Sequence, residues 1–180
     1  AGHVVHEPIE CFDIVPTTLE LADITPTHIH FARSMTPQLQ GAPGDADRAI
    51  FAEGGYDPHD PHCFEGRPAD GICSNPAGIY YPKGMQQQDH PESVCRATMI
   101  RTMAHKLVRR TSGQHELYDL STDPRETHNR WGDPTLADVQ QQLLERMLDW
   151  YVTTADVVPT DPDPRGFPAD VNSLLSPIVA

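Results

Sequence analysis

The sequence predicts an α+β fold in which a small antiparallel sheet of about four strands packs with a long C-terminal amphipathic helix. The first observation is a series of short apolar segments that are separated by turn residues, which is typical of an antiparallel meander. The second is one long segment near the C-terminus with apolar residues at helical spacing. The third is composition: of 180 residues 38% are hydrophobic, and 18 are proline and 12 glycine. These numbers indicate one modest, loop-rich domain.

The first element is a helix over about residues 14–23. Asp13 is predicted as its N-cap, because an aspartate side chain can accept hydrogen bonds from the free N–H groups of the first turn. Pro16 lies in that first turn, where a missing N–H costs little. Because the residue before a proline avoids helical geometry, the helix should end before Pro26.

A short strand is predicted over 48–53, followed by an irregular stretch from Gly54 to about Val94. This stretch contains two adjacent glycines and several prolines, and it is rich in histidine, cysteine and aromatic residues. Long loops inside a compact domain usually carry function. We therefore expect this segment to face a substrate or a neighbouring cleft.

Three further strands are predicted over 97–102, 105–110 and 115–120, with turns between them. The hairpin carries several basic side chains, and guanidinium groups there could form an anion site. The alternative is an ordinary solvated strand face, which the alternation of buried and wet positions favours. The basic residues in question are Arg101, His105, Arg109 and Arg110.

The C-terminal helix is predicted over 134–154, with Asp133 as N-cap and Pro134 in the first helical position. Its apolar residues recur every three or four positions, which indicates one buried face against the meander. Trp131, Trp150 and Tyr151 are expected in the core. Several prolines after this helix predict an extended tail over 156–180. The apolar stripe consists of Leu136, Val139, Leu143, Met147 and Trp150.

Charge and hydropathy exclude several classes of partner. The formal net charge is −13, which argues against a nucleic-acid binder and against docking to anionic lipid. No apolar run approaches the length that spans a bilayer.

The cysteines are Cys11, Cys63, Cys73 and Cys95, with no C-x-x-C pair. One disulfide among the loop cysteines and free thiols therefore both stay open.

The densest group of potential ligands lies in the irregular stretch. His59 and His62 are three residues apart and Cys63 is adjacent, and imidazole and thiolate suit zinc or copper. No second pair of ligands stands at a diagnostic spacing, so a loop that faces substrate is the favoured interpretation.

Three blocks of sequence resemble type I sulfatases of the alkaline phosphatase-like superfamily. Glu116–Asn129 (ELYDLSTDPRETHN) is similar to the C-terminal signature ELYDL-x-x-DP-x-E-x-x-N of that family. The preceding segment over 99–108 looks like its MVRT…YKLV hairpin, and 12–24 looks like its xDLxPTLLxLAGI helix. One departure is Asp23, which stands where the family usually has glycine and alters the C-cap of the helix.

The resemblance implies a parent enzyme that hydrolyses sulfate esters with a formylglycine and a calcium ion. The motifs that supply both belong to the larger N-terminal part of the family and have no counterpart here. We therefore assign no catalytic residue and no metal ligand to this chain, and expect it to be inactive alone. Cys63 and Arg67 have the spacing of a formylglycine motif, but Glu65 and their place in the chain mark that match as chance.

The resemblance also implies a division of the chain. Residues 1–40 would end the catalytic α/β domain, 41–155 would form the C-terminal subdomain with a variable loop over 54–95, and the abrupt start at Ala1 would be a cut inside a fold. The subdomain would pack on the rest of the catalytic domain and form one wall of the substrate cleft. Its substrate-binding side chains are predicted to be Tyr56, His59 and His62.

Two alternatives stay open for function. The parent could be a phosphodiesterase or phosphonate hydrolase of the same superfamily, or the chain could be a non-catalytic binding module that kept the fold. The sulfate ester itself is undetermined, with aryl sulfates, sulfated glycans and choline-like esters all possible. Because many family members are exported, a periplasmic or secreted location is favoured over the cytoplasm.

Overall fold

The computed structural model describes residues 2–26, 30–57 and 75–155, and the chain divides into two compact units. One unit holds the described residues up to Arg48 together with those from Leu144 onward. The other spans 49–143 and contains the sheet. Each unit is described by itself.

The first unit begins with a short 3-10 turn, η1 (Cys11–Asp13), that leads directly into the helix α1 (Ile14–Leu21). A second short helix, α2 (Thr36–Leu39), contacts α1. The predicted helix is confirmed, and Asp13 occupies its N-cap position, but the predicted side-chain capping hydrogen bond is absent. The Asp13 carboxylate accepts a hydrogen bond from the backbone N–H of Glu10, which precedes it, and caps no N–H of the first turn of α1.

The C-terminus of α1 is closed by two backbone hydrogen bonds. The N–H of Ile24 donates to the carbonyl of Leu19 at 2.9 Å, and the N–H of Asp23 donates to the carbonyl of Glu20 at 3.1 Å. This pattern is a Schellman motif, which requires a left-handed residue after the C-cap. Asp23 adopts that conformation with φ of 56°. It therefore stands at a position where glycine, the residue usual in the resembled family, would be less strained.

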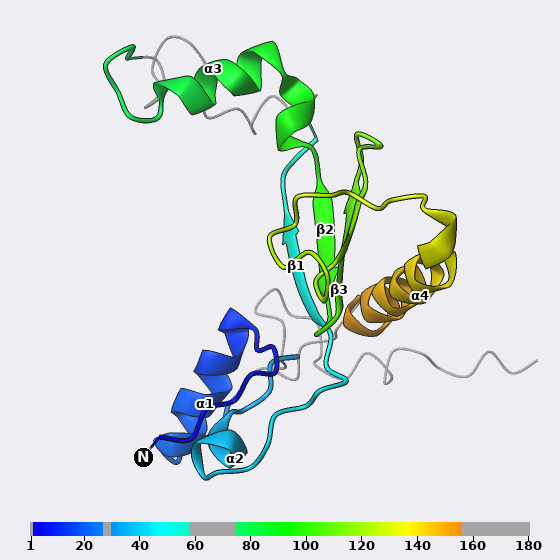
Figure 1. Ribbon diagram of the computed structural model, residues 1–180. Coiled ribbons are helices and arrows are strands. Elements are labelled where there is room, and N and C mark those ends of the chain that lie inside the picture. Colours follow the sequence, from blue (N-terminus) through cyan, green and yellow to red (C-terminus); the bar gives the residue numbers. More distant parts are fainter. Residues whose placement is uncertain (1, 27–29, 58–74, 156–180) are drawn as a thin grey trace, which may run out of the picture. The chain divides into compact units, whose positions relative to one another are not determined.

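The second unit contains a four-stranded antiparallel sheet in the order β1-β2-β3-β4, as the sequence predicts (Figure 1). Its strands are β1 (Ile50–Gly54), β2 (Ala97–Arg101), β3 (His105–Arg110) and β4 (Glu116–Asp119). One apolar row crosses all four strands, because the register aligns Phe51, Ile100, Leu107 and Leu117. The last three of these side chains are fully buried, so this row forms the centre of the core.

A helix that the sequence analysis missed lies in the stretch expected to be irregular. α3 (Tyr81–Asp89) is followed by the 3-10 turn η2 (Pro91–Val94), which contacts it. Pro82 and Gly84 favoured an irregular reading. Pro82, however, occupies the start of the helix, where proline is tolerated, and Gly84 is buried.

The C-terminal helix is present as a short 3-10 turn, η3 (Pro134–Leu136), that continues into α4 (Ala137–Thr154). Asp133 is the N-cap as predicted, and its side chain accepts from the N–H of Thr135 at 2.8 Å. The stripe predicted to be buried includes Leu143 and Met147, at 4% and 5% exposure. The first turns of α4, up to Leu143, belong to the unit of the sheet.

The aromatic residues near this helix are less buried than predicted. Trp131 and Trp150 are half-buried, and Tyr151 is 39% exposed.

The part of the chain that the structure describes contains no helix with the length and apolar composition of a membrane span.

Candidate functional site

Tyr56, one of the three predicted substrate-binding residues, lies just after the end of β1. Tyr56 is half-buried and forms a parallel bridge with Cys95, and its N–H donates to the carbonyl of Val94 at 2.8 Å. This bridge ties the start of the loop to its end. His59 and His62 lie outside the described residues, so their grouping with Tyr56 stays a prediction.

Gly55 explains how the chain can approach Cys95 so closely. Its φ is 81°, and a Cβ at this position would overlap the carbonyl of Cys95. Only glycine satisfies both requirements without a shift of the backbone. Cys95 is a buried free thiol and Cys11 an exposed one, whereas Cys63 and Cys73 lie outside the described residues.

Two of the four basic residues of the predicted hairpin, Arg109 and Arg110, have local partners. Arg110 donates two hydrogen bonds to Glu116 Oε1, at 3.0 and 2.6 Å. Arg109 contacts His115 and lies over the ring of Trp131, 5.7 Å from its centroid. Burial, followed by the charge of Arg109, lowers the pKa of His115. These contacts favour the alternative of an ordinary strand face over an anion site.

The acidic residues of the C-terminal signature organise a turn. Asp123 Oδ2 accepts from the N–H groups of Thr127 and His128, at 2.7 and 2.8 Å. Burial opposes ionisation of Asp123, but these hydrogen bonds lower its pKa on balance. Glu126 follows with φ of 57° and pairs with Lys106 Nζ at 2.5 Å.

Asn129, the last residue of the signature, joins this turn to strand β4. Its Oδ1 accepts from the N–H groups of Leu117 and Trp131, both at 3.0 Å, and its Nδ2 donates to the carbonyl of His115 at 2.9 Å. An amide can donate and accept at once, which neither aspartate nor leucine of similar size can do. The signature therefore serves the fold of this unit.

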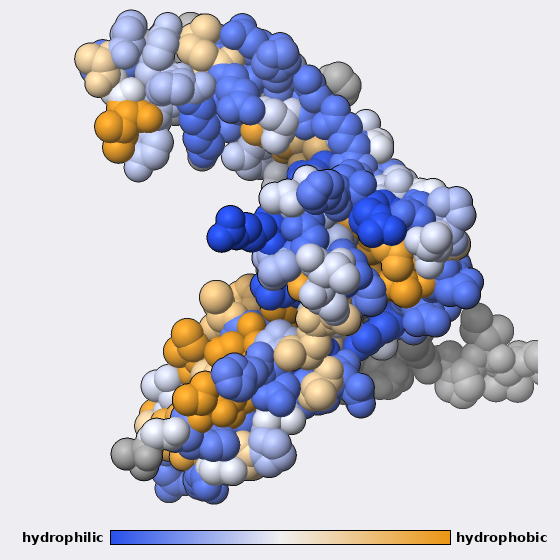
Figure 2. All heavy atoms as spheres, in the orientation of Figure 1, coloured by the Kyte–Doolittle hydropathy of each residue, from blue (hydrophilic) through white to orange (hydrophobic). Residues whose placement is uncertain are grey.

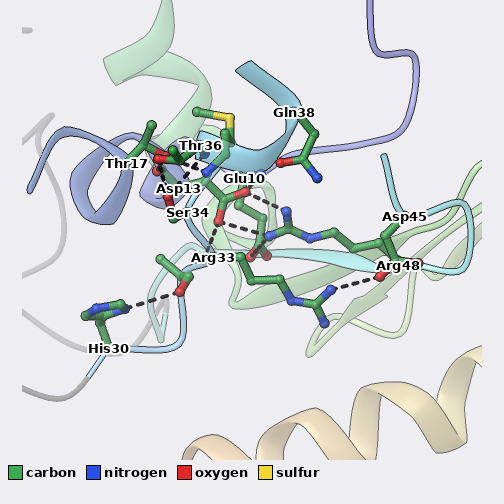
Figure 3. A network of polar contacts seen from close by, with 12 residues as sticks. Glu10, Asp13, Thr17, His30, Arg33, Ser34, Thr36, Gln38, Asp45 and Arg48 are labelled. Carbon is green, nitrogen blue, oxygen red and sulfur yellow. Dashed lines mark hydrogen bonds and ion pairs between the residues drawn. The ribbon is translucent and has the colours of Figure 1, made fainter. Parts of the chain in front are cut away.

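The first unit contains a buried ion pair, which Figure 3 shows at the centre of a polar network. Asp13 is fully buried, and Arg48 donates to both of its oxygens, at 2.6 Å (Nη1 to Oδ2) and 3.0 Å (Nη2 to Oδ1). The N–H of Arg33 donates to Oδ1 at 2.8 Å, and that of Glu10 donates to Oδ2 at 2.9 Å. Glu10 also accepts from Arg48 at 3.3 Å.

Thr17 extends this network by one turn of α1. Its hydroxyl donates to the carbonyl of Asp13 at 2.5 Å and accepts from the N–H of Met35 at 2.8 Å. We call Glu10, Asp13, Thr17 and Arg48 the buried hub. It ties η1 and α1 to residues 33–35 and to Arg48, which are distant in sequence.

The electrostatics of the buried hub are those of a structural ion pair. Burial alone would raise the pKa of Asp13, but the hydrogen bonds from Arg48 and from two backbone N–H groups lower it. A carboxylate whose lone pairs are all engaged, and whose pKa is depressed, is a poor general base at neutral pH.

The described residues contain no group of three or more histidine, cysteine, aspartate or glutamate side chains placed to hold a metal ion. The carboxylates of Asp13 and Asp123 are instead engaged by arginine or backbone donors. These donor sets do not fit calcium, so we derive no step through a metal in this chain.

This chain is similar in sequence to one known protein family. Residues 77–152 match the family described as N-sulphoglucosamine sulphohydrolase, C-terminal. Over these residues the chain is similar to the C-terminal part of that family. A search of the curated proteins finds no significant match.

Several solved structures are similar to this chain in fold. A phosphonate monoester hydrolase from Silicibacter pomeroyi is 24% identical with a TM-score of 0.58, over 86% of this chain and 27% of that one. A protein solved with its substrate D-glucosamine-2-N,6-O-disulfate is 23% identical at 0.55, over 84% and 25%. A 2-O GAG sulfatase is 19% identical at 0.53, over 85% and 27%. The segment thus spans about a quarter of the length of these proteins.

Sequence reasoning missed Arg48 as a partner of Asp13. The two residues are 35 positions apart, and the sequence pattern identifies Arg48 only as the start of a strand. No periodicity links them, and a buried ion pair leaves no local signal. The signature residues were found through the resemblance, but their structural role appears only in the hydrogen bonds.

Proposed function

We propose that this segment belongs to a longer protein, called here the parent protein, that hydrolyses sulfate esters. The observation that carries the proposal is the match of residues 77–152 to the C-terminal family of N-sulphoglucosamine sulphohydrolase. The role of this segment would be to pack on the catalytic domain and to form one wall of the substrate cleft.

The proposal assigns different roles to this segment and to the remainder of the parent protein. A formylglycine and a calcium ion would come from the remainder of the parent protein, since the carboxylates of Asp13 and Asp123 are engaged by internal donors. Residues 1–40 would close the catalytic domain, 41–155 would form the subdomain, and 156–180 would be an extended tail. Supporting this, the solved proteins of similar fold are about four times as long as the matched part.

The substrate-binding contribution is assigned to Tyr56, His59 and His62. The bridge between Tyr56 and Cys95 supports this assignment, because it anchors the loop in which the two histidines lie. A phenol and two imidazoles could hold a sugar ring and an anionic substituent. We expect a sulfated amino sugar as substrate, in line with the names of the family and of one solved relative.

The first experiment tests the activity of the parent protein. Intact mass spectrometry should detect oxidation of a cysteine or serine to formylglycine. Turnover should be highest on N- or 6-O-sulfated glucosamine within a panel that includes an aryl sulfate and a phosphonate monoester. Robust turnover by the 180-residue chain alone would contradict the proposal.

The second experiment tests the cleft wall. In the parent protein, His59→Ala and His62→Ala should lower kcat/KM on the preferred sulfate ester by about tenfold or more, the loss expected when a hydrogen bond to a charged group is removed. His128→Ala is the matched control, because this histidine is 81% exposed and lies in the signature turn. Unchanged kcat/KM in both loop variants would contradict the assignment of His59 and His62 as substrate-binding residues.

A phosphonate monoester hydrolase is the second candidate, and the similarity to two solved hydrolases of this kind favours it. It predicts preferential turnover of the phosphonate in the same panel. A non-catalytic binding module would bind sulfated sugar with no turnover in any form of the protein.

A further inference from the structure

His115 ends the turn between β3 and β4, and its ring is held between two hydrogen-bond donors. Nδ1 accepts from the backbone N–H of Arg110 at 3.3 Å, and Nε2 contacts the guanidinium of Arg109. The ring also packs on Trp131, with 4.6 Å between the two ring centroids. We call Arg109, His115 and Trp131 the ring clasp.

Only a neutral imidazole suits this position. A neutral ring keeps one nitrogen lone pair, which can accept from one of the two donors, whereas an imidazolium has an N–H on each nitrogen and accepts nothing. Protonation would therefore point both N–H groups of His115 at donors and add a positive charge beside Arg109. The direction of the pKa agrees with this geometry, because burial and then the charge of Arg109 lower the pKa of His115.

The carboxylate next to His115 in sequence is not placed to compensate this charge. Arg109 and Arg110 are successive residues of β3, so their side chains point to opposite faces of the sheet. His115 lies with Arg109, whereas Glu116 lies with Arg110 and accepts from it at 2.6 Å. The second oxygen of Glu116 accepts from the hydroxyl of Tyr118 at 3.0 Å. Glu116 is therefore engaged on the other face.

The other charged groups near the ring clasp are paired or distant. Asp133 follows the clasp in sequence and forms an ion pair with Arg130 at 2.6 Å. Glu53 shares the cross-strand row of Arg109 through Thr98, which places it two strand spacings, about 10 Å, from Arg109. Among the described residues, none pairs its carboxylate with the imidazole.

The same turn holds the base of the variable loop. The N–H of Thr111 donates to the carbonyl of Arg96 at 2.9 Å. Burial raises the pKa of the Cys95 thiol, but hydrogen bonds from Ser112 and Thr111 lower it on balance. A shift of the turn therefore changes the contacts of Cys95, the residue whose bridge with Tyr56 closes the loop.

We propose that the ring clasp is a pH-sensitive latch that joins the β3–β4 turn to the base of the variable loop. At neutral pH the uncharged ring of His115 stays on Trp131 and fixes the turn. In acid the imidazolium leaves Trp131 for water, and the contacts of the turn with Cys95 and Arg96 loosen. Residues 111–114 are exposed, and the surface that Figure 2 shows over the strands is mainly hydrophilic, so a charged ring is well solvated outside the clasp. The latch requires no assumption about the reaction of the parent protein.

Emission of Trp131 tests the latch in the 180-residue chain with Trp150→Phe, which removes the other tryptophan. Because the folded pKa of His115 lies below its unfolded value of about 6.5, the clasp is complete above that pH and is lost as the pH falls through the folded pKa. The emission should therefore change with a midpoint below about pH 6.5. Arg109→Gln should raise the midpoint, because it removes the neighbouring charge, and His115→Gln should abolish the transition. His128→Gln is the matched control, since this histidine is 81% exposed, and it should leave the midpoint unchanged.

Native-state amide exchange tests the connection to the loop. Protection of the Thr111 and Tyr56 amides, corrected for intrinsic exchange rates, should fall severalfold between about pH 7 and about pH 5 in the wild type. It should stay constant in His115→Gln, because a neutral amide can still accept from the N–H of Arg110.

Three outcomes would overturn the proposal. They are a transition that persists in His115→Gln, an Arg109→Gln midpoint at or below that of the wild type, and equal protection of the two amides in acid and at neutral pH. If His115→Gln does not fold, the midpoint of Arg109→Gln and the amide protection of the wild type decide alone.

Discussion

Replacement of Arg48 by methionine would remove the charge that compensates the buried Asp13. Arg48 is 8% exposed and Asp13 fully buried, and two short hydrogen bonds of 2.6 and 3.0 Å join them. Methionine keeps much of the volume of the side chain and its apolar stem but donates nothing. The variant therefore isolates the loss of the ionic contact from the loss of packing.

The expected cost is about 3 kcal/mol in the free energy of unfolding of the first unit. Breaking one partner of a buried pair costs about 3–5 kcal/mol. The lower end applies here because the N–H groups of Arg33 and Glu10 continue to donate to Asp13. A cost of about 3 kcal/mol corresponds to roughly two orders of magnitude in an equilibrium constant.

Native-state amide exchange of α1 is the assay, because it reports local opening of this unit. Protection of the α1 amides should fall by about a hundredfold in Arg48→Met. Arg33→Met is the matched control: its guanidinium pairs with Asp45 at 2.9 Å, with side chains 61% and 50% exposed, so the loss should stay below about 1 kcal/mol. Equal effects of the two variants would refute the reasoning.

Three further predictions concern caps and titration. Because the folded pKa of Asp13 lies below its unfolded value, its contribution to stability is complete above about pH 4 and is lost as the pH falls through the folded pKa. Protection of α1 should fall in that window in the wild type and much less in Arg48→Met. Asp23→Gly should stabilise α1 by about 0.5–1 kcal/mol, because Asp23 has a φ of 56° and glycine adopts this conformation without strain. A lower free energy of unfolding of this variant in urea would contradict the idea that Asp23 is strained. Asn129→Ala should cost about 2 kcal/mol in urea denaturation, because the N–H of Leu117 loses its acceptor, and a neutral effect would show that water replaces the amide.

Local signals were sufficient to predict most of the elements. The turns on either side of 105–110 and the apolar alternation located the meander, and the stripe through Leu143 and Met147 located α4. The helix α3 was not predicted because Pro82 and Gly84 are poor helix formers, although Pro82 is tolerated in the first turn and Gly84 is buried. The first strand was placed two residues early, because nothing local distinguishes Arg48 as the partner of a distant carboxylate.

The candidate site was predictable only in part. The composition of the loop drew attention to Tyr56, and the structure places it beside Cys95. Side-chain roles that depend on contacts across many residues, such as those of Asn129, are invisible in one sequence. The resemblance located the signature but said nothing about which atoms its residues bind.

The bridge between Tyr56 and Cys95 has a consequence for how such a fold can diversify. It closes the long excursion between β1 and β2 at its base, directly beyond the last register pair of Gly54 with Ala97. Doubling the length of a closed flexible loop costs only about 0.6 kcal/mol of entropy. Insertions and deletions between Tyr56 and Cys95 can therefore change the loop while β1 and β2 keep their register. A new specificity can thus arise by exchange of the loop alone, without changes in the sheet.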